Sequence, residues 1–317
     1  MTRILVTGGA GYIGGTAVDI LLRQGFEISV LDDCSTGHAD VVPNGVRFVK
    51  GSLLDKVAIK ESLQDCSAVI HFAGKSLVGE SVIKPELYWQ VNVVGSRNLL
   101  DVMRESDVKQ IVFSSSAATY GEPEAVPIKE NAPTRPTNAY GATKLAIDAM
   151  ITDETKAHGL AAASLRYFNV AGALKSERGW LTERHDPETH LIPNILKSTL
   201  GNPVKIFGAD WQTADGTCVR DYVHVVDLID AHISALRVIR ESSHEIINLG
   251  SGTGYSVMEV LDSASAALGH QVPFIKSARR PGDPAVLIAD ITKAKKVLDW
   301  SPVRDINVMV ADAAASR

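Results

Sequence analysis

A glycine-rich segment near the start of the chain constrains the fold more than any other feature. It reads Thr7-Gly8-Gly9-Ala10-Gly11-Tyr12-Ile13-Gly14, with Gly8, Gly11 and Gly14 spaced three positions apart. Apolar residues 4–6 precede it with the length of a buried strand, and residues 16–24 follow with helical spacing. Glycine permits the tight turn and the close strand–helix contact that such a junction needs. The segment therefore predicts a strand, a sharp turn and a helix.

Strand-like and helical segments alternate through the first half of the chain. Further apolar runs of strand length lie at 28–31, 47–49, 68–72, 110–114 and 163–167. Segments with helical spacing include 89–104 and 139–156. This alternation predicts an α/β fold with a doubly wound parallel sheet of the Rossmann type, helices on both faces, and ligands at the carboxyl ends of the strands.

The alternation weakens after Tyr167. A helix is expected at 191–200 and another buried strand at 246–249, among stretches punctuated by Pro and Gly. We therefore expect residues 1–168 to form the first domain, with a return to its sheet at about 222–252. The remainder of 169–317 is expected to form a smaller, mixed domain.

Charge and cysteine content exclude several classes of function. The 317 residues carry a net charge of −5, so nucleic acid is not expected as the main ligand. Three scattered cysteines form no disulfide framework, and without a Cys-x-x-Cys pair no metal is expected. No apolar run approaches the roughly 20 residues of a membrane span, so we expect a cytoplasmic protein without membrane contact.

The glycine turn predicts a dinucleotide site. A helix N-terminus binds phosphate through unpaired N–H groups and the helix dipole, and Gly11 lets the backbone approach a pyrophosphate. Asp32, 18 residues after Gly14, ends the second predicted strand. Its carboxylate would accept hydrogen bonds from ribose hydroxyls and repel a 2′-phosphate, and residues 33–36 supply no Arg or Lys. The expected cofactor is NAD rather than NADP.

Ser116, Tyr140 and Lys144 form a candidate catalytic set. Ser116 lies near the carboxyl end of a predicted strand, and Tyr140 and Lys144, four positions apart, share one face of a predicted helix. A free tyrosine has a pKa of about 10, and a neighbouring ammonium favours its phenolate. The set predicts a general base beside a hydride acceptor, with Ser116 relaying the substrate proton.

Together these residues resemble the extended short-chain dehydrogenase/reductase family, and within it the enzymes that invert C4 of UDP-sugars. Matching segments include Phe72–Lys75, Asn92, Arg166–Asn169, Ile206–Gly208, Gly216–Val225 and Arg279–Asp283. The resemblance implies NAD-dependent 4-epimerisation of a UDP-hexose, UDP-glucose or UDP-galactose, through a transient 4-keto intermediate. Tyr140, directly or through Ser116, would remove the proton of the 4-hydroxyl.

The resemblance also implies which residues bind the ligands. The predicted cofactor residues are Gly8, Gly11, Tyr12, Ile13, Gly14, Asp32, Asp33, Ser52, Leu53, Phe72, Ala73, Lys75, Asn92, Ser114, Tyr140, Lys144 and Tyr167. The predicted substrate residues are Lys75, Ser116, Tyr140, Asn169, His190, Leu191, Phe207, Arg220, Arg280 and Asp283. Arginine suits a diphosphate because it is always charged and binds oxygens in pairs. A homodimer is expected through the helices at 89–104 and 139–156.

The sequence leaves several alternative functions open. Related 4,6-dehydratases and decarboxylating enzymes place carboxylates beside the strand-end serine or threonine, whereas this chain has Ser116-Ala117-Ala118. Another UDP-sugar, an N-acetylhexosamine, uronate or pentose, is the nearer alternative, because Leu287 at the expected pocket edge is intermediate in size. Ser52 stands where the family usually has Asp. A non-catalytic NAD-binding regulator would lack the Tyr140–Lys144 pair.

Overall fold

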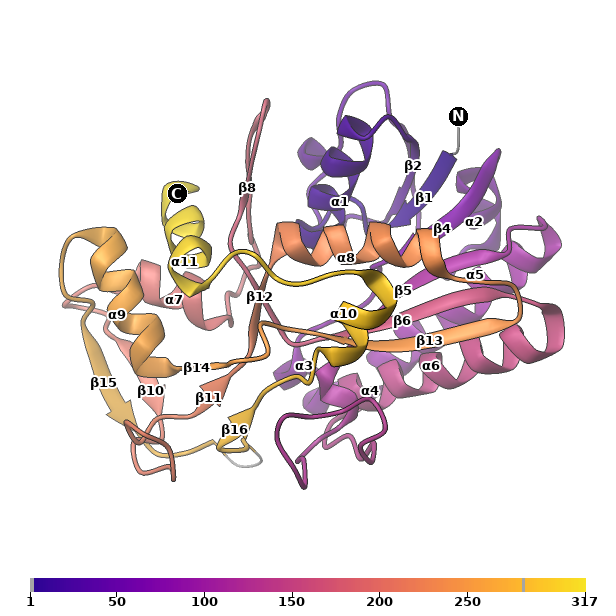
Figure 1. The fold of residues 1–317 in the computed structure, drawn as a ribbon. Helices are drawn as coiled ribbons and strands as arrows, with labels where there is room; N and C mark the ends of the chain where they lie inside the picture. Colours follow the sequence, from indigo (N-terminus) through magenta and orange to yellow (C-terminus); the bar gives the residue numbers. More distant parts are fainter. Residues whose placement is uncertain (1–2, 281–282) are drawn as a thin grey trace. The chain divides into compact units, whose positions relative to one another are not determined.

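The computed structural model describes residues 3–280 and 283–317 (Figure 1). The chain forms two compact units, each built from separated segments. The first extends to Gly121 and includes Thr134–Arg166 and Ile229–Ile247. The second comprises Glu122–Pro133, Tyr167–Leu228 and the chain from Asn248 onward. The segment Ile229–Ile247 belongs to the first unit and lies within the range 222–252, where the sequence predicts a return to the first sheet.

A seven-stranded sheet forms the centre of the first unit. Its strands are β1 (Arg3–Thr7), β2 (Glu27–Asp32), β3 (Arg47–Lys50), β4 (Cys66–His71), β5 (Gln110–Ser116), β6 (Ala161–Tyr167) and β13 (Ser243–Leu249). Their order is β13-β6-β5-β4-β1-β2-β3, and β1 pairs in parallel with both β2 and β4. The order reverses between β1 and β4, where a doubly wound sheet opens a ligand crevice at its carboxyl edge. The predicted fold class is confirmed.

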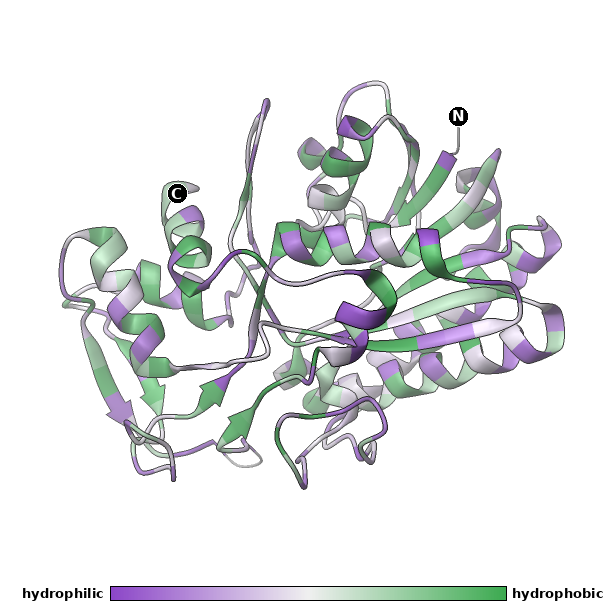
Figure 2. Cartoon of the chain, in the orientation of Figure 1, coloured by the Kyte–Doolittle hydropathy of each residue, from purple (hydrophilic) through white to green (hydrophobic). Residues whose placement is uncertain are grey.

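Helices accompany this sheet and bury its apolar side chains. They are α1 (Tyr12–Arg23), η1 (Ala39–Val41), α2 (Lys56–Ser62), α3 (Val78–Ile83), α4 (Pro85–Tyr88), η2 (Trp89–Val94), α5 (Gly95–Glu105), η3 (Ala117–Thr119), α6 (Ala139–His158) and α8 (Val225–Val238). Leu99, Phe113 and Ile147 belong to one buried cluster that joins α5, β5 and α6. Figure 2 shows β1 and β4 as largely apolar. Each such side chain contributes about 1.5–3 kcal/mol when fully buried.

One of the two long helices predicted for this unit differs from expectation in detail. The helix expected at 89–104 begins as the π-helix η2 and continues as α5, so its first turns are wider than those of an α-helix. The helix expected at 139–156 is confirmed as α6. Asn138 caps its N-terminus by accepting the Gly141 N–H, and Gly159 ends it with a φ of +75°.

The second unit contains short strands and helices, three of which pack around one core. Its elements are β7 (Asn169–Ala171), β8 (Leu174–Ser176), β9 (Gly179–Leu181), α7 (Leu191–Lys197), β10 (Val204–Phe207), β11 (Val219–Arg220), β12 (Tyr222–His224), β14 (Tyr255–Ser256), α9 (Val257–Leu268), β15 (Phe274–Ser277), β16 (Val286–Leu287), α10 (Thr292–Leu298) and α11 (Ile306–Ala315). Ile195, Val260 and Met309 form a core between α7, α9 and α11. The helix expected at 191–200 is shorter, ending at Lys197.

The described helices include none with the length and apolarity needed to cross a bilayer. The three cysteines are free thiols. Burial raises the pKa of the Cys66 thiol to about 11, which keeps it protonated near neutral pH.

Candidate active site

The glycine turn brings the start of α1 against the ends of β1 and β4. Gly11 donates its N–H to the Gly8 carbonyl over 3.1 Å, and Gly8 has a φ of +73°. A Cβ on Gly14 would lie 2.0 Å from the Gly8 oxygen, and one on Gly8 would lie 2.7 Å from the Ala73 nitrogen. Both positions therefore require glycine.

The N-terminus of α1 fits an anionic group. Gly11 occupies its N-cap position without a side-chain hydrogen bond, and the first turn, which holds Tyr12 and Ile13, contains no acidic residue. A helix start of this kind offers N–H groups and a positive dipole end to a phosphate. The predicted pyrophosphate residues therefore form a cradle that suits a dinucleotide.

Asp32 lies at the carboxyl end of β2, beside the glycine turn. Its carboxylate accepts the N–H groups of Ala10 at 2.9 Å and Cys34 at 2.8 Å. Burial raises the pKa of Asp32, and these two hydrogen bonds oppose the rise. Asp33 accepts the N–H of Ser35 at 2.8 Å. The two carboxylates thus order the loop after β2, where a ribose is expected.

The loop after β3 places Ser52 and Leu53, two of the predicted cofactor residues. Ser52 accepts the Leu54 N–H at 3.2 Å, and Leu53 is buried against Gly95, where a Cβ would lie 2.9 Å from the Leu53 Cβ. Asp55 caps α2 through the N–H groups of its first turn. The carboxylate that follows β3 therefore stabilises a helix, and Ser52 is left as the polar side chain at the expected position.

Asn92 holds the loop after β4 from both sides. Its Oδ1 accepts the Lys75 N–H at 2.8 Å, while its Nδ2 donates to the Lys75 carbonyl and to Thr143 Oγ1, each at 3.1 Å. The side chain is 1% exposed and lies in the π-helix η2. The centre of the Phe72 ring lies 4.8 Å from that of His232, and the two rings are tilted by 45°. The structure thus shows Asn92 positioning Lys75 and α6, and a direct cofactor contact stays a prediction.

The candidate catalytic side chains meet where β5 ends and α6 begins. Lys144 Nζ donates to the Ser114 carbonyl at 2.7 Å and lies 5.8 Å from the centre of the Tyr140 ring. The Tyr140 hydroxyl is hydrogen-bonded to Ser116. Gly141 allows this approach, because a Cβ there would lie 2.4 Å from the Ala118 oxygen. The structure therefore brings Ser116, Tyr140 and Lys144 together, and their catalytic roles stay a prediction.

Burial perturbs both titrating groups of this set. It lowers the pKa of Lys144 to about 8, although the attraction of Asp148 opposes the change. It raises the pKa of Tyr140, and the Ser116 hydrogen bond opposes that rise. A cationic ligand beside the phenol would lower the pKa of Tyr140, as the Ser116 hydrogen bond does. Of the two groups, Lys144 therefore titrates closer to neutral pH, and Tyr140 would need such a cation beside it to act as a base there.

His71 is a residue of this region that the sequence reasoning missed. At the end of β4, its Nδ1 contacts Thr7 Oγ1 at 2.7 Å and its Nε2 contacts Ser96 Oγ at 2.9 Å. Burial and the nearby Lys144 lower the pKa of His71 to about 3, which keeps it neutral. It joins β1, β4 and α5 without adding charge. The sequence signal was its place at a strand end within an apolar run.

The second unit gathers most of the predicted nucleotide residues. The Arg280 guanidinium lies over the Phe207 ring at 4.0 Å, and Arg220 lies 3.7 Å from the Asp283 carboxylate. Arg220 on β11 pairs in register with Leu287 on β16. Two arginines, an aromatic face and a carboxylate therefore share one small region. Pro281 and Gly282 of the same predicted segment lie outside the described residues.

Asn169 is placed by Asp221, a buried residue that the sequence reasoning did not single out. Asn169 Nδ2 donates to the Asp221 carbonyl at 2.9 Å. The Asp221 carboxylate accepts the N–H groups of Ser251 and Ala289 at 2.6 and 2.9 Å. Tyr167, a predicted cofactor residue, is buried at the end of β6. Asp221 therefore fixes the loops beside Asn169 and Arg220.

His190 and Leu191 begin α7, beside a cluster of imidazoles and carboxylates. Ligand atoms of Glu183, His185 and His190 lie within 4.8 Å of one another. His185 Nδ1 contacts Glu183 at 2.5 Å, and His190 Nδ1 contacts Glu188 at 2.7 Å. Each imidazole thus has a carboxylate partner, so the cluster is satisfied without an ion.

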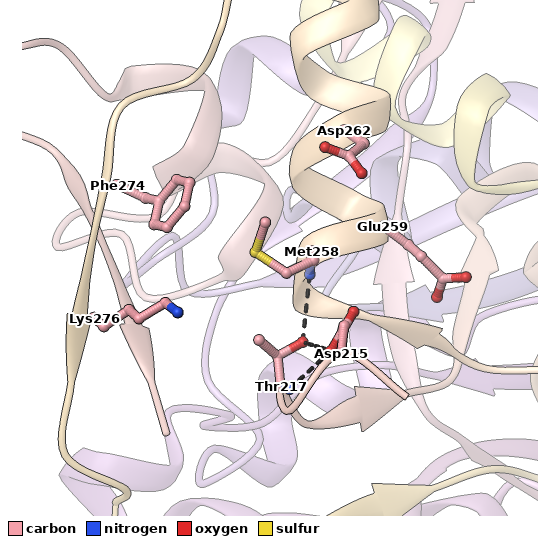
Figure 3. A pocket seen from close by; sticks show the side chains of 7 residues that line it. All are labelled: Asp215, Thr217, Met258, Glu259, Asp262, Phe274 and Lys276. Carbon is pink, nitrogen blue, oxygen red and sulfur yellow. Dashed lines mark hydrogen bonds between the residues drawn. The ribbon is translucent and has the colours of Figure 1, made fainter. Parts of the chain in front are cut away.

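A cavity of about 390 Å³ lies elsewhere in the second unit, between α9 and β15 (Figure 3). Figure 3 shows Phe274 and Lys276 facing Met258 and Asp262 across it. Its other carboxylates have local partners, because Asp215 accepts two bonds from Thr217 and Glu259 closes the capping box of α9. None of the predicted site residues lines this cavity.

Comparison with known proteins agrees with the geometry. A profile of the NAD dependent epimerase/dehydratase family matches residues 4–250. The chain is 50% identical over 316 residues to UDP-glucose 4-epimerase of Corynebacterium glutamicum, covering 99% of this chain and 95% of that protein. It is 40% identical to the structure of UDP-glucose 4-epimerase from Brucella ovis in complex with NAD, with a TM-score of 0.93 and coverage of 99% and 98%.

A third relative was solved with both ligands. The structure of UDP-glucose 4-epimerase from Bifidobacterium longum in complex with NAD⁺ and UDP is 37% identical, with a TM-score of 0.91 and coverage of 99% and 97%. The likeness extends over the whole chain and includes both units. The resemblance drawn from the sequence is confirmed, and this chain belongs to the NAD-dependent epimerase/dehydratase family.

Proposed function

We propose that this protein interconverts UDP-glucose and UDP-galactose by NAD-dependent inversion at C4 of the hexose. The observation that carries the proposal is the Lys144–Ser114 bond beside the Tyr140–Ser116 bond. Sequence identities of 50% and 48% to two UDP-glucose 4-epimerases, over 99% and 98% of this chain, support the same reaction. The Ser116-Ala117-Ala118 stretch has no carboxylate for dehydration, which disfavours that alternative.

One group of side chains transfers the proton, and another binds the diphosphate. Tyr140 accepts the proton of the 4-hydroxyl, with Ser116 orienting that hydroxyl and Lys144 stabilising the phenolate. Bound NAD would accept the C4 hydride and return it. Arg220 and Arg280 retain the diphosphate, so that the 4-keto sugar stays bound while its opposite face turns toward the cofactor. Tyr140 then returns the proton.

Except for Tyr167 at the end of β6, the NAD site of the proposal uses residues of the first unit. The uncapped start of α1 would hold the pyrophosphate, Asp32 the adenosine ribose, and Ser52 and Leu53 the adenine. Lys75, fixed by Asn92, would reach the ribose or the substrate. These assignments, with those of Phe72, Ala73, Ser114 and Tyr167, are proposals from the resemblance and from their places at the carboxyl ends of strands.

The test is a panel of UDP-sugars scored for inversion at C4. It contains UDP-glucose, UDP-galactose, their N-acetyl forms, UDP-glucuronate and UDP-pentoses, because Leu287 beside Arg220 leaves the choice of sugar open. UDP-glucose and UDP-galactose should interconvert fastest. With deuterium at C4, the label should stay on carbon. Loss of the label to water, or preference for another sugar, would contradict the proposal.

We also propose a cytoplasmic homodimer formed through the segments at 89–104 and 139–156. Trp89 and Val94 on η2 are 43% and 41% exposed, and a paired helix face would cover them. Light scattering after size exclusion should give twice the mass of 34.0 kDa. A mass equal to one chain would contradict this.

A further inference from the structure

Asp148 lies one helical turn after Lys144 on α6 and is 3% exposed, as is Arg166 on β6. Asp148 Oδ2 accepts Arg166 Nε at 3.0 Å and Nη2 at 2.9 Å, and it accepts Ser115 Oγ at 3.1 Å. One carboxylate oxygen therefore joins α6, β5 and β6. The contact lies directly behind the candidate catalytic set.

The other oxygen of Asp148 has no such partner. Within the described chain, Oδ1 has no hydrogen-bond partner, although the atom is buried. An unpaired buried oxygen is costly and uncommon. A carboxylate that only joined the three elements would not need a second buried oxygen without a hydrogen-bond partner. The charge on Asp148 is instead available to Lys144, whose pKa its attraction raises against the effect of burial.

The titratable groups near Lys144 come from three elements. Tyr140 and Asp148 lie on α6, His71 faces Lys144 from β4, and Arg166 pairs with Asp148 from β6. His71 is neutral near pH 7, because burial lowers its pKa to about 3. Asp148 is therefore the only anion among these groups of the described chain.

We propose that Asp148, paired with Arg166, is a positioning residue that holds α6 and β5 in the register at which Lys144 bonds Ser114 and Tyr140 faces Ser116. Two consecutive residues of β5 hold this register. The Ser114 carbonyl accepts a hydrogen bond from Lys144, and the Ser115 hydroxyl donates one to Asp148. A slip of α6 along β5 would break both contacts. The inference deepens the proposed function and rests on it.

The test compares the parent enzyme with the double variant Asp148→Asn/Arg166→Met. Replacing both partners avoids a buried arginine without a counter-ion, which the single variant Asp148→Asn would leave. The midpoint of Tyr140 ionisation is followed by phenolate absorbance, subtracting the spectrum of Tyr140→Phe in each background. Because this titration needs no sugar, it remains informative even if the proposed substrate is wrong.

In the double variant, Lys144 loses its proton at lower pH and no longer supports the phenolate. The midpoint of Tyr140 should rise by about half a unit to one unit. The kcat for the UDP-sugar should fall about tenfold while KM is unchanged, because nucleotide residues are untouched. Asp148→Glu keeps the negative charge, so this variant should retain most of the parent's Tyr140 midpoint and most of its kcat. An unchanged midpoint and kcat, with only lower thermal stability, would overturn the proposal.

A matched control removes a different buried ion pair. Asp227 is almost fully buried and bonded to Arg304 in the second unit. The double variant Asp227→Asn/Arg304→Met should lower thermal stability and leave the midpoint of Tyr140 in place. If this variant moved the midpoint equally, the effect would be a general consequence of lost stability, and the proposal would fail.

Discussion

The two units present their predicted functional groups in different ways. In the first, Ser116 ends a seven-residue strand, and Tyr140 and Lys144 lie on a twenty-residue helix, with each polar atom bonded to a neighbour. In the second, Arg220 lies on a two-residue strand and Arg280 in a loop. Proton transfer needs atoms held in a fixed geometry, whereas a diphosphate can be bound by long side chains from irregular backbone. Substitutions in the first unit should therefore act mainly on kcat, and those in the second mainly on KM.

The largest effect is expected for Tyr140→Phe. The variant keeps the ring and loses the hydroxyl that bonds Ser116, so no group remains to take the 4-hydroxyl proton. The kcat should fall by about 10³-fold, within the usual range for a general base. NAD content, measured after denaturation, should be unchanged. Epimerisation at the parent rate would remove Tyr140 from the mechanism and with it the main contrast between the units.

Lys144→Met should separate activity from stability. Burial lowers the pKa of Lys144 from 10.5 to about 8, so between these values the unfolded chain binds more protons and this group's contribution to stability rises with pH. Below pH 8, the buried ammonium is unfavourable. We expect the variant to be about 1–2 kcal/mol more stable at pH 7 in urea unfolding and about 100-fold lower in kcat.

The stability gain of Lys144→Met should shrink as the pH rises from 8 to 10.5, since the parent gains stability over that range. Unfolding curves at pH 7 and pH 9.5 test this directly. A gain that is equal at both values, or a loss at pH 7, would show that the Lys144–Ser114 bond outweighs the cost of burying the charge.

Arg280→Ala tests the second unit. It removes the guanidinium that lies over Phe207. We expect KM for the UDP-sugar to rise about 20-fold with kcat within about threefold of the parent, because uniform binding is lost. Arg279→Ala is the matched control: Arg279 bonds exposed Asp210 at 2.7 Å, and KM should not change. A fall in kcat alone for Arg280→Ala would contradict the division between the units.

The sequence predicted the first unit more completely than the second. The glycine spacing, the apolar strands and the Tyr140–Lys144 interval each indicate a regular local structure, so they predicted the sheet and the helix that carries Tyr140 and Lys144. The buried partners of this set were missed. His71 and Asp148 are polar residues whose roles depend on strands and helices that meet only after folding.

In the second unit, the strands have only two to four residues, too short for a periodic signal. Arg220 and Arg280 were therefore found by resemblance rather than by pattern. The π-helix at Trp89–Val94 was also not predicted, because its apolar spacing is that of an ordinary helix. The wider turn of this π-helix contains Asn92, whose side-chain amide is hydrogen-bonded to both Lys75 and Thr143.

The smallest predicted effects compare one helix cap in each unit. Asn138 caps α6 through the Gly141 N–H at 2.9 Å, two residues before Tyr140, and Asp305 caps α11 through the Val308 N–H at 3.0 Å. Asn138→Ala and Asp305→Ala should each cost about 1 kcal/mol in urea unfolding. Only Asn138→Ala should also lower kcat, about threefold to tenfold, because a frayed first turn lets Tyr140 leave Ser116. Equal kcat values in the two variants would mean that the first turn of α6 tolerates motion, and that precise placement of the base depends on the deeper contacts of Lys144 instead.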